Sequence, residues 1–374
     1  MLLLQANRDD ILRPLQSVIG VVERRNTLPI LSNVLIEKNG GGLSFVATDL
    51  EIQITATARV GEIAGTDFAV TVSARKLQDI CRAFPENAQL AAHGDDSRLQ
   101  LRIGKSRFHL QTLPAEDFPR ISPITDDKTA LRVSQNVLRR LLNEVQYAMA
   151  QQDIRYYLNG MLMVVGSQHL TVVATDGHRL AYANSELNQA GDSPAAESQE
   201  VILPRKTVLE LLKLLGDSDD EVRIEIGRNQ IRFTFANIEL VSKIVEGKFP
   251  DYTKVIPASY RNTFQVDRVA LLQALQRAAI LSNEKFRGVR LVLTQNSLRI
   301  FCSNTEQEEA QEELEIAYAG EPLDIGFNVN YLLDVLNHQD GAEVEWAFGD
   351  ANSSGLITVP GNAHFKYVVM PMRI

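Results

Sequence analysis

The stretch Leu43-Ser44-Phe45-Val46-Ala47-Thr48-Asp49 decides the fold, because it returns twice in the same chain. Its second copy is Leu170-Thr171-Val172-Val173-Ala174-Thr175-Asp176, and its third is Leu298-Arg299-Ile300-Phe301-Cys302-Ser303-Asn304. The copies start at residues 43, 170 and 298, so their spacing is nearly constant. Short apolar runs rich in β-branched residues predict strands. A repeat with a domain-sized period indicates three copies of one structural unit.

The residues around each copy repeat as well. Upstream, Leu31–Val34 matches Leu158–Met161 and Phe286–Val289, so each copy is predicted to contain a strand, a short turn and a second strand. Downstream, a helical stretch opens with Arg75-Lys76 in the first copy and with Arg205-Lys206 in the second. Chance similarity between hairpins is the alternative explanation. The same order of elements, three times over, argues against it.

Proline-rich segments separate the copies. Pro119–Thr129 and Pro250–Thr263 are the predicted linkers. A segment rich in Ala, Ser, Gly and acidic residues, Asn188–Gln199, is predicted to be an exposed loop of the second copy. Each copy combines two helical patterns with many alternating strands, which predicts an α+β fold with antiparallel sheets. The predicted domains are residues 1–125, 126–253 and 254–374.

Charge is unevenly distributed between the predicted helices and the rest of the chain. The six predicted helices, residues 8–22, 75–84, 134–147, 205–215, 267–280 and 330–337, together carry +5. Because the whole chain carries −9, the remainder carries −14. Solvated helix faces of mixed charge are the simpler explanation for any single helix. The contrast across the chain instead favours a mildly positive helical surface that faces a polyanion without binding it tightly.

The composition is that of an ordinary globular protein, with 45% hydrophobic and 23% charged residues. No apolar run approaches the roughly 18 residues that a membrane span needs, and the start has no signal-peptide pattern. We therefore expect a cytoplasmic location. Cys81 and Cys302 match no metal or redox spacing and lie among apolar residues, so buried free thiols are expected.

Motifs for catalysis, metals and cofactors are weak. Gly104-Lys105-Ser106 resembles a phosphate loop, but Leu99 stands where its first glycine is required. Asp176-Gly177-His178 suggests acid–base chemistry, yet no nucleophile motif accompanies it, which favours a structural or peptide-contacting histidine. The acidic run Glu306–Glu313 is compatible with a metal site, a charged face or a partner surface. We predict no catalytic residue, no metal and no cofactor.

Several longer strings resemble the bacterial DNA sliding clamps, the beta subunit of the DNA polymerase III holoenzyme. The resemblance runs from about residue 10 to the C-terminus. The strings that carry it are Thr27-Leu28-Pro29-Ile30-Leu31, Tyr156-Tyr157-Leu158-Asn159-Gly160-Met161, Ala174-Thr175-Asp176-Gly177-His178-Arg179-Leu180-Ala181, Ile280-Leu281-Ser282-Asn283-Glu284-Lys285-Phe286-Arg287-Gly288-Val289-Arg290 and Met370-Pro371-Met372-Arg373.

The resemblance implies a non-enzymatic processivity factor. Each protomer would supply three similar domains and form half of a ring, and two protomers would close head to tail around double-stranded DNA with helices lining the hole. Its implied partners are DNA without sequence preference, a second copy of itself, the replicative polymerase subunit, the clamp loader, and other polymerases and repair proteins that carry short peptide motifs.

The resemblance also places a partner-peptide cleft between domains two and three. An apolar groove with Met and Leu adapts to several peptide sequences. Lys254 stands where the family frequently has arginine, and lysine lacks the planar fork of arginine. The alternative for Met370–Ile374 is a simple last strand. The implied cleft residues are Leu158, Thr175, Gly177, His178, Arg179, Leu180, Pro250, Lys254, Val255, Asn328, Tyr331, Val368, Val369, Met370, Pro371, Met372 and Arg373.

Two further sets of residues follow from the resemblance. Tyr156 and Tyr157 are equally compatible with core aromatics. The implied DNA contacts are Arg25, Gln152, Arg155, Tyr156, Tyr157, Arg205 and Lys206. The implied dimer interface sets a basic segment of domain one against an apolar and acidic segment of domain three. Its residues are Lys105, Arg107, Phe108, Ile280, Leu281, Glu306, Glu308 and Glu309.

Three other classes of function fit the sequence less well. A polymerase-type enzyme needs paired carboxylates that hold metal ions, and the chain shows no convincing motif for them. A sequence-specific transcription factor needs a recognition element that reaches base edges, and none stands out. A scaffold that does not bind DNA is disfavoured by the charge distribution and by the resemblance.

Overall fold

The computed structural model describes residues 2–23, 28–39, 42–60, 62–63, 67–94, 97–124, 129–166, 168–187, 198–258, 260 and 262–374. Arg25, the predicted domain boundary at residue 125 and most of the predicted loop, residues 188–197, lie outside these ranges. The chain forms two compact units. Unit 1 is Met1–Asn136 with Leu209–Ile244, and unit 2 is Val137–Val208 with Val245–Ile374.

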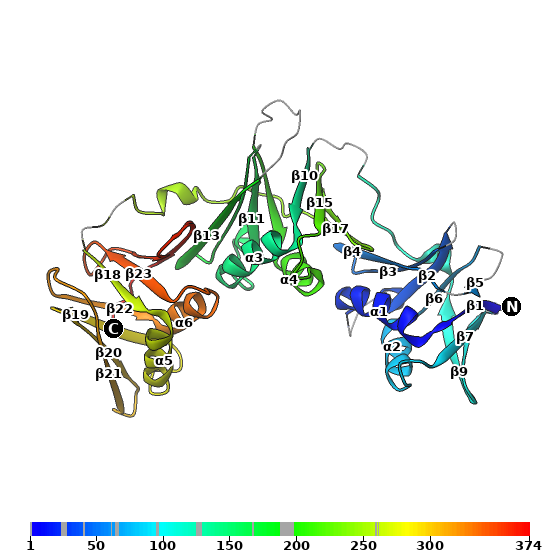
Figure 1. The fold of residues 1–374 in the computed structure, drawn as a ribbon, viewed down its shortest axis with the longest axis horizontal. Coiled ribbons are helices and arrows are strands. Elements are labelled where there is room, and N and C mark those ends of the chain that lie inside the picture. The colour runs from blue at the N-terminus through cyan, green and yellow to red at the C-terminus, as the bar shows by residue number, and fades with distance from the viewer. Residues whose placement is uncertain are drawn as a thin grey trace. The chain divides into compact units, whose positions relative to one another are not determined.

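Unit 1 is built on one antiparallel sheet. Its described strands follow the order β10-β15-β16-β17-β4-β3-β2-β6-β9-β8-β7-β1-β5. Their bounds are β1 Leu2–Asn7, β2 Asn33–Asn39, β3 Gly42–Thr48, β4 Ile52–Ala58, β5 Glu62–Ile63, β6 Ala69–Ser73, β7 Gln89–Gly94, β8 Arg98–Ile103, β9 Ser106–Leu113, β10 Thr129–Ser134, β15 Glu221–Ile226, β16 Gln230–Phe235 and β17 Ile238–Lys243. Helices α1 (Arg8–Val18) and α2 (Ala74–Arg82) contact each other, and both contact strands of this sheet (Figure 1).

Unit 2 contains two antiparallel sheets. One follows the order β14-β11-β12-β13-β25-β24-β23-β18, and the other follows β21-β20-β19-β22. The bounds are β11 Gly160–Val165, β12 His169–Thr175, β13 Arg179–Glu186, β14 Gln199–Pro204, β18 Asn262–Asp267, β19 Gly288–Thr294, β20 Ser297–Ser303, β21 Glu309–Glu315, β22 Leu323–Asn328, β23 Glu343–Phe348, β24 Gly355–Val359 and β25 Asn362–Val369. Helix α5 (Arg268–Ala279) packs on β20, β21 and helix α6 (Val329–Asn337).

The predicted repeat is confirmed. The three quoted stretches form β3, β12 and β20, and each pairs with the strand before it and the strand after it. Each copy thus has a first four-stranded half, β6-β2-β3-β4, β14-β11-β12-β13 or β22-β19-β20-β21. Each also has a second half, β9-β8-β7-β1, β17-β16-β15-β10 or β25-β24-β23-β18. The α+β class predicted from the sequence is confirmed.

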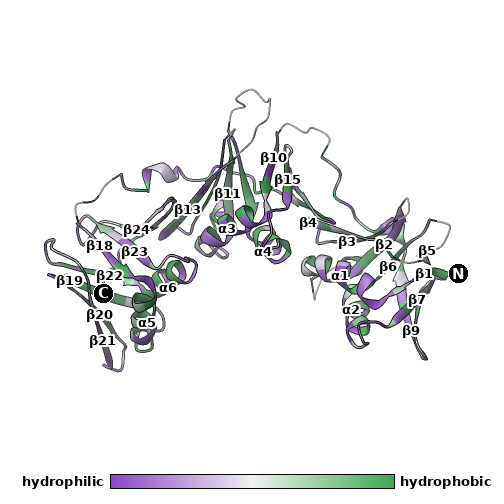
Figure 2. Ribbon diagram, in the orientation of Figure 1, coloured by the Kyte–Doolittle hydropathy of each residue, from purple (hydrophilic) through white to green (hydrophobic). Residues whose placement is uncertain are grey.

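The predicted helices are also found. Helices α3 (Gln135–Val145) and α4 (Arg205–Leu214) complete the set in the described part of the chain. Asp267 caps α5, since its carboxylate accepts the N–H of Ala270 at 2.7 Å. Purple and green positions occur along both α1 and α2, as amphipathic helices require (Figure 2). Both cysteines are buried free thiols, and burial raises the pKa of Cys81 to about 12 and that of Cys302 to about 11.

A carboxyl group on α3 makes stability depend on pH. Glu144 is 8% exposed, and burial raises its pKa to about 7 although Arg140 lies 3.8 Å away. Because the folded pKa lies above the usual value of 4.5, this group stabilises the fold at low pH. The stabilisation is lost as the pH rises through about 7.

We expect Glu144→Gln to mimic the protonated form. At pH 8 the free energy of unfolding of the variant should be roughly 2 kcal/mol higher than that of wild type, because the variant buries no charge. Below pH 4.5 the difference should vanish, since Glu144 is protonated in both states. Chemical denaturation of both proteins at pH 4.5, 6 and 8 measures this. A difference that is constant with pH would contradict the assignment.

Candidate functional site: an apolar pocket with a C-terminal wall

Unit 2 contains an apolar pocket of about 190 Å³ at the ends of β12, β13 and β25. The segment after β17 passes over it and contributes Phe249, Pro250, Tyr252 and Val255. The other lining residues are Arg155, Leu158, Thr175, Gly177, His178, Arg179, Leu180, Val368 and Met370.

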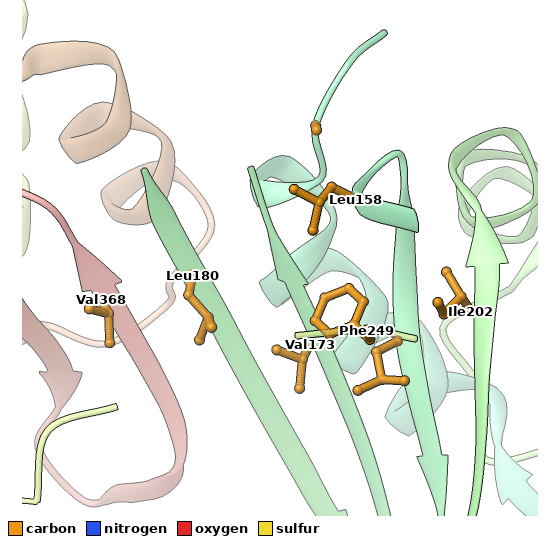
Figure 3. Close-up of a cluster of buried hydrophobic side chains, with 8 residues drawn as sticks. Leu158, Val173, Leu180, Ile202, Phe249 and Val368 are labelled. Atoms are coloured by element: carbon orange, nitrogen blue, oxygen red, sulfur yellow. The ribbon is translucent and has the colours of Figure 1, made fainter. Parts of the chain in front are cut away.

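The pocket floor belongs to a hydrophobic cluster. Leu180 on β13 and Val368 on β25 face each other across a strand pair. The ring of Phe249 lies between Leu158 and Val173 (Figure 3), and all of these side chains are at most 6% exposed. Tyr157, Tyr182 and Tyr252 pack against the cluster from outside. The floor is therefore a rigid apolar surface.

A tight turn between β12 and β13 forms one rim. The Asp176 carboxylate accepts the N–H groups of His178 at 2.9 Å and Arg179 at 3.1 Å. Thr175 donates its hydroxyl to the Arg179 carbonyl at 2.6 Å. The first copy repeats this turn with Thr48 and Asp49. Because Asp176 is engaged in turn formation, it does not pair with the His178 ring as an acid–base dyad would.

Arg179 links this turn to two other elements. Its guanidinium donates to Asp176 at 3.1 Å, to Asp334 on α6 at 2.5 Å and to the Tyr147 carbonyl at 2.7 Å. It also lies 4.4 Å from the centre of the Tyr331 ring. Its side chain is 9% exposed. The planar fork thus holds the rim against the underlying helix.

Gly177 adopts φ +90° at the tip of the turn. A Cβ there would lie 3.0 Å from a terminal nitrogen of Arg155. We expect Gly177→Ala to lower the free energy of unfolding by about 1–2 kcal/mol, since an L-residue is strained at this φ. Leu50 occupies the same position of the first copy at φ +77°. Leu50→Ala leaves that strain unchanged and should cost clearly less in denaturation experiments. Equal losses at both positions would contradict this explanation.

The structure brings most, but not all, of the predicted cleft residues to this pocket. Ten line it: Leu158, Thr175, Gly177, His178, Arg179, Leu180, Pro250, Val255, Val368 and Met370. Seven do not: Lys254, Asn328, Tyr331, Val369, Pro371, Met372 and Arg373. Sequence reasoning missed Phe249 and Tyr252 and assigned Arg155 to DNA alone. Pro250 was predicted as a cleft residue, but its neighbour Phe249 was not.

The seven other residues have identifiable positions. Lys254 pairs with Asp251 at 3.0 Å and is 83% exposed. Asn328 caps α6, since its side chain accepts the N–H of Asn330. Tyr331 lies beneath Arg179 and stacks near His178. Val369 is fully buried in β25, and Pro371 lies in the tail that follows it. Met372 and Arg373 line a separate groove of about 700 Å³ that also includes Phe286, Arg290 and Phe301.

The predicted DNA residues differ in exposure. Tyr156 is 58% exposed, whereas Tyr157 packs on the hydrophobic cluster, so the two neighbours have different environments. Arg155 pairs with Asp153 at 2.9 Å. Gln152 is exposed in a left-handed conformation. Arg205 donates to the Met149 carbonyl at 3.4 Å, and burial lowers its pKa. Lys206 is half-buried at the start of α4.

Three of the predicted dimer residues, Arg107, Phe108 and Glu309, lie on β9 and β21, two strands with an open edge, and the others lie outside these strands. Among the described strands, β9 pairs with β8 along its length but with β6 only at Thr112 and Leu113, and β21 pairs with β20 alone. Lys105 and Arg107 are exposed, and Phe108 packs edge-on against Phe84. Ile280 ends α5 and is 77% exposed, beside the half-buried Leu281. Glu306, Glu308 and Glu309 are exposed.

Nothing in the described residues groups three His, Cys, Asp or Glu side chains as a metal site would. The acidic run instead makes local contacts: Glu312 pairs with Arg277 at 2.6 Å, and Glu313 accepts the Ser297 hydroxyl at 2.6 Å. Within the same described part, no helix is long and apolar enough to cross a membrane.

Comparison with known proteins identifies the family. Three family models match in tandem: the N-terminal domain of the DNA polymerase III beta subunit over residues 2–122, its central domain over 132–251 and its C-terminal domain over 253–373. The beta sliding clamp of Pseudomonas putida is 46% identical over 367 residues, covering 98% of both chains. That of Escherichia coli K12 is 44% identical over 368 residues, again with 98% of both chains covered.

Solved structures agree. A crystal structure of the sliding clamp from Pseudomonas aeruginosa bound to griselimycin matches with a TM-score of 0.94, 44% identity and full coverage of both chains. The chain therefore belongs to the beta-subunit family of DNA polymerase III, the bacterial sliding clamps. Members of this family are non-catalytic processivity subunits.

Proposed function

We propose that the chain functions as a sliding clamp through three surfaces. A pair of strand edges closes a dimeric ring, and a mildly positive helical surface faces double-stranded DNA. The third surface is the apolar pocket of unit 2, which binds partner peptides. One observation carries the proposal. Among the described strands, neighbouring copies of the repeat are joined by pairing between their outer strands. One outer strand of the first copy and one of the third copy then pair with no other copy.

The two junctions within the chain are alike. The outer strand β4 of the first copy pairs with β17 of the second, and β13 of the second pairs with β25 of the third. Ala56 pairs with Ile238, and its repeat equivalent Ala183 pairs with Phe365. The equivalent strands left over are β21 of the third copy and β9 of the first. Pairing β21 of one protomer with β9 of its partner extends the same rule between chains.

The side chains at these edges support head-to-tail closure. Lys105 and Arg107 beside β9 are basic, whereas Glu306, Glu308 and Glu309 at the start of β21 are acidic. Ile280 follows helix α5, which contacts β21, and adds an exposed apolar side chain. An interface between different surfaces closes into a ring only when its rotation fits, and two such contacts complete six domains. The domain boundaries near 125 and 253 are part of this proposal.

The pocket suits short linear peptides. Its floor is apolar and rigid, and Met370 adds an adaptable wall. His178 and Arg179 at the rim, with Arg155 and Tyr252, supply polar and aromatic contacts. A related clamp, that of Pseudomonas aeruginosa, has been crystallised bound to griselimycin. We infer that the replicative polymerase subunit, the clamp loader, other polymerases and repair proteins dock here, and that the protein works in the cytoplasm.

DNA binding should be weak and independent of sequence. The helices of the structure carry +6, because Asp267 lies outside α5 as its cap, and the rest of the chain carries −15. A surface of this kind releases few counterions, so its affinity has a shallow salt dependence. We expect micromolar or weaker binding to a short linear duplex and equal binding to scrambled sequences, measured by fluorescence anisotropy. Nanomolar, sequence-dependent binding at physiological salt would contradict the proposal.

A further inference from the structure

The C-terminal tail Met370–Ile374 is held at two points by its backbone although it belongs to no strand. Strand β25 ends at Val369. The N–H of Met370 donates to the His178 carbonyl at 2.8 Å, and the N–H of Met372 donates to the Gly326 carbonyl at 2.8 Å. The first bond fixes the tail at the pocket and the second fixes it on the edge of β22. The end of the tail has a third contact, through the Ile374 side chain.

Ile374 sits on a pair of glycines. Gly288 on β19 pairs with Asn328, and Gly326 on β22 pairs with Arg290, so the two glycines lie diagonally on one face of the sheet. A Cβ at residue 326 would lie 2.5 Å from the Met372 carbonyl oxygen and 2.7 Å from Ile374 Cδ1. A Cβ at residue 288 would lie 3.2 Å from Ile374 Cδ1. The tail occupies the space that two side chains would fill.

The backbone does not require glycine at these positions. The positive-φ glycines of the described chain are Gly104, Gly177, Gly247 and Gly361, and neither Gly288 nor Gly326 is among them. Glycine inside a strand without a special φ commonly marks the close approach of another segment. Here the approaching segment is the tail, because the nearest atoms to both glycines belong to Met372 and Ile374.

This contact bears on the peptide pocket. Met370 lines the pocket and is 44% exposed, and only three residues separate it from Ile374. One of them is Pro371, whose ring limits backbone rotation. We propose that Ile374 is a positioning residue for partner binding: seated on Gly288 and Gly326, it holds the tail in place and keeps Met370 at the pocket. This inference rests on the proposed role of the pocket.

Two substitutions break the contact from opposite sides. Ile374→Ala removes the side chain, and Gly326→Ala places a methyl group where the tail lies. Ile374 is 66% exposed and the atoms nearest Gly326 belong to the tail, so the folded core is not disturbed. Each variant should bind a polymerase-tail peptide with about 5–10-fold lower affinity, because the pocket is no longer preorganised. Gly326→Ala also clashes with the Met372 carbonyl oxygen, so it should weaken binding at least as much as Ile374→Ala, and the double variant should lose little more than Gly326→Ala alone.

Controls separate positioning from structure. Ile374→Val should restore most of the affinity. Val269→Ala, at a 44% exposed aliphatic position on α5, should leave it unchanged. A second readout needs no peptide: in a ¹³C-methyl spectrum, the Met370 signal should sharpen and move toward the position of a free methionine in Ile374→Ala and Gly326→Ala, while Met161 and Met163 stay unchanged.

The outcomes are distinct. If both variants bind the peptide with wild-type affinity and show an unchanged Met370 signal, the role proposed for Ile374 is overturned. The proposed pocket would not be affected by that result. Wild-type protein that binds no peptide would refute the proposed pocket. In that case the Met370 signal alone decides whether Ile374 holds the tail.

Discussion

Ile280→Asp combined with Leu281→Asp is expected to convert the protein from a dimer of about twice 41.6 kDa to a monomer of 41.6 kDa. Ile280 is 77% exposed at the end of α5, next to the open edge of β21. Exposure alone does not identify an interface, but Ile280 follows helix α5, which contacts β21, the strand proposed to pair with the partner. Two carboxylates buried without partners should weaken association at least about 1,000-fold, or about 4 kcal/mol. Light scattering at micromolar concentration measures the mass.

The matched control is Ile154→Asp. Ile154 is 96% exposed, and it lies in the loop before Tyr156 rather than beside β9 or β21. This variant should remain a dimer. If the wild-type protein is a monomer or a trimer, the proposed dimeric ring is refuted. If the double variant stays dimeric, Ile280 and Leu281 lie outside the interface.

Removal of Met370–Ile374 should abolish peptide binding and leave the dimer intact. The deletion takes away Met370, one wall of the pocket, together with the backbone bond from Met370 to His178. Burial of one large apolar side chain is worth about 1.5–3 kcal/mol, so loss of the Met370 side chain alone should lower the affinity about 10- to 150-fold, and loss of the remaining tail contacts adds to this. Calorimetric titration of one polymerase-tail peptide against both proteins measures this loss.

The dimer should survive because the tail lies outside β25, which ends at Val369. The alternative, that Met370–Ile374 is simply a last strand, is therefore wrong. Light scattering of the truncated protein is the control. Unchanged peptide affinity after truncation would show that the pocket is misplaced, and loss of the folded dimer would show that the tail carries more of the fold than these contacts indicate.

Much of the fold was predictable because the chain repeats it. The stretches that became β3, β12 and β20 follow the same order of elements three times. Helix ends were also predictable where a capping side chain is encoded locally, as with Asp267. The joining of copies through β4–β17 and β13–β25 was not predictable from one sequence, because pairing between distant strands leaves no local pattern.

The site was predictable in part. The resemblance identified the turn around Gly177 and His178, which lines the pocket. It did not show which neighbouring side chains are exposed and which are buried. Tyr156 and Tyr157 are neighbours in one turn, and only the structure shows that the first is exposed while the second packs on the core. Phe249 was missed because its burial depends on β11, β12 and β14, which come from another part of the chain.

Retention on circular DNA tests the central claim most directly. The protein is loaded onto a nicked circular plasmid with a bacterial clamp loader and ATP, and gel filtration separates bound from free protein. Cutting the plasmid once should release the protein, because a closed ring slides off a free end while its few phosphate contacts do not hold it. Protein that stays bound after linearisation, or that never stays with the circle, would contradict a ring that encircles DNA.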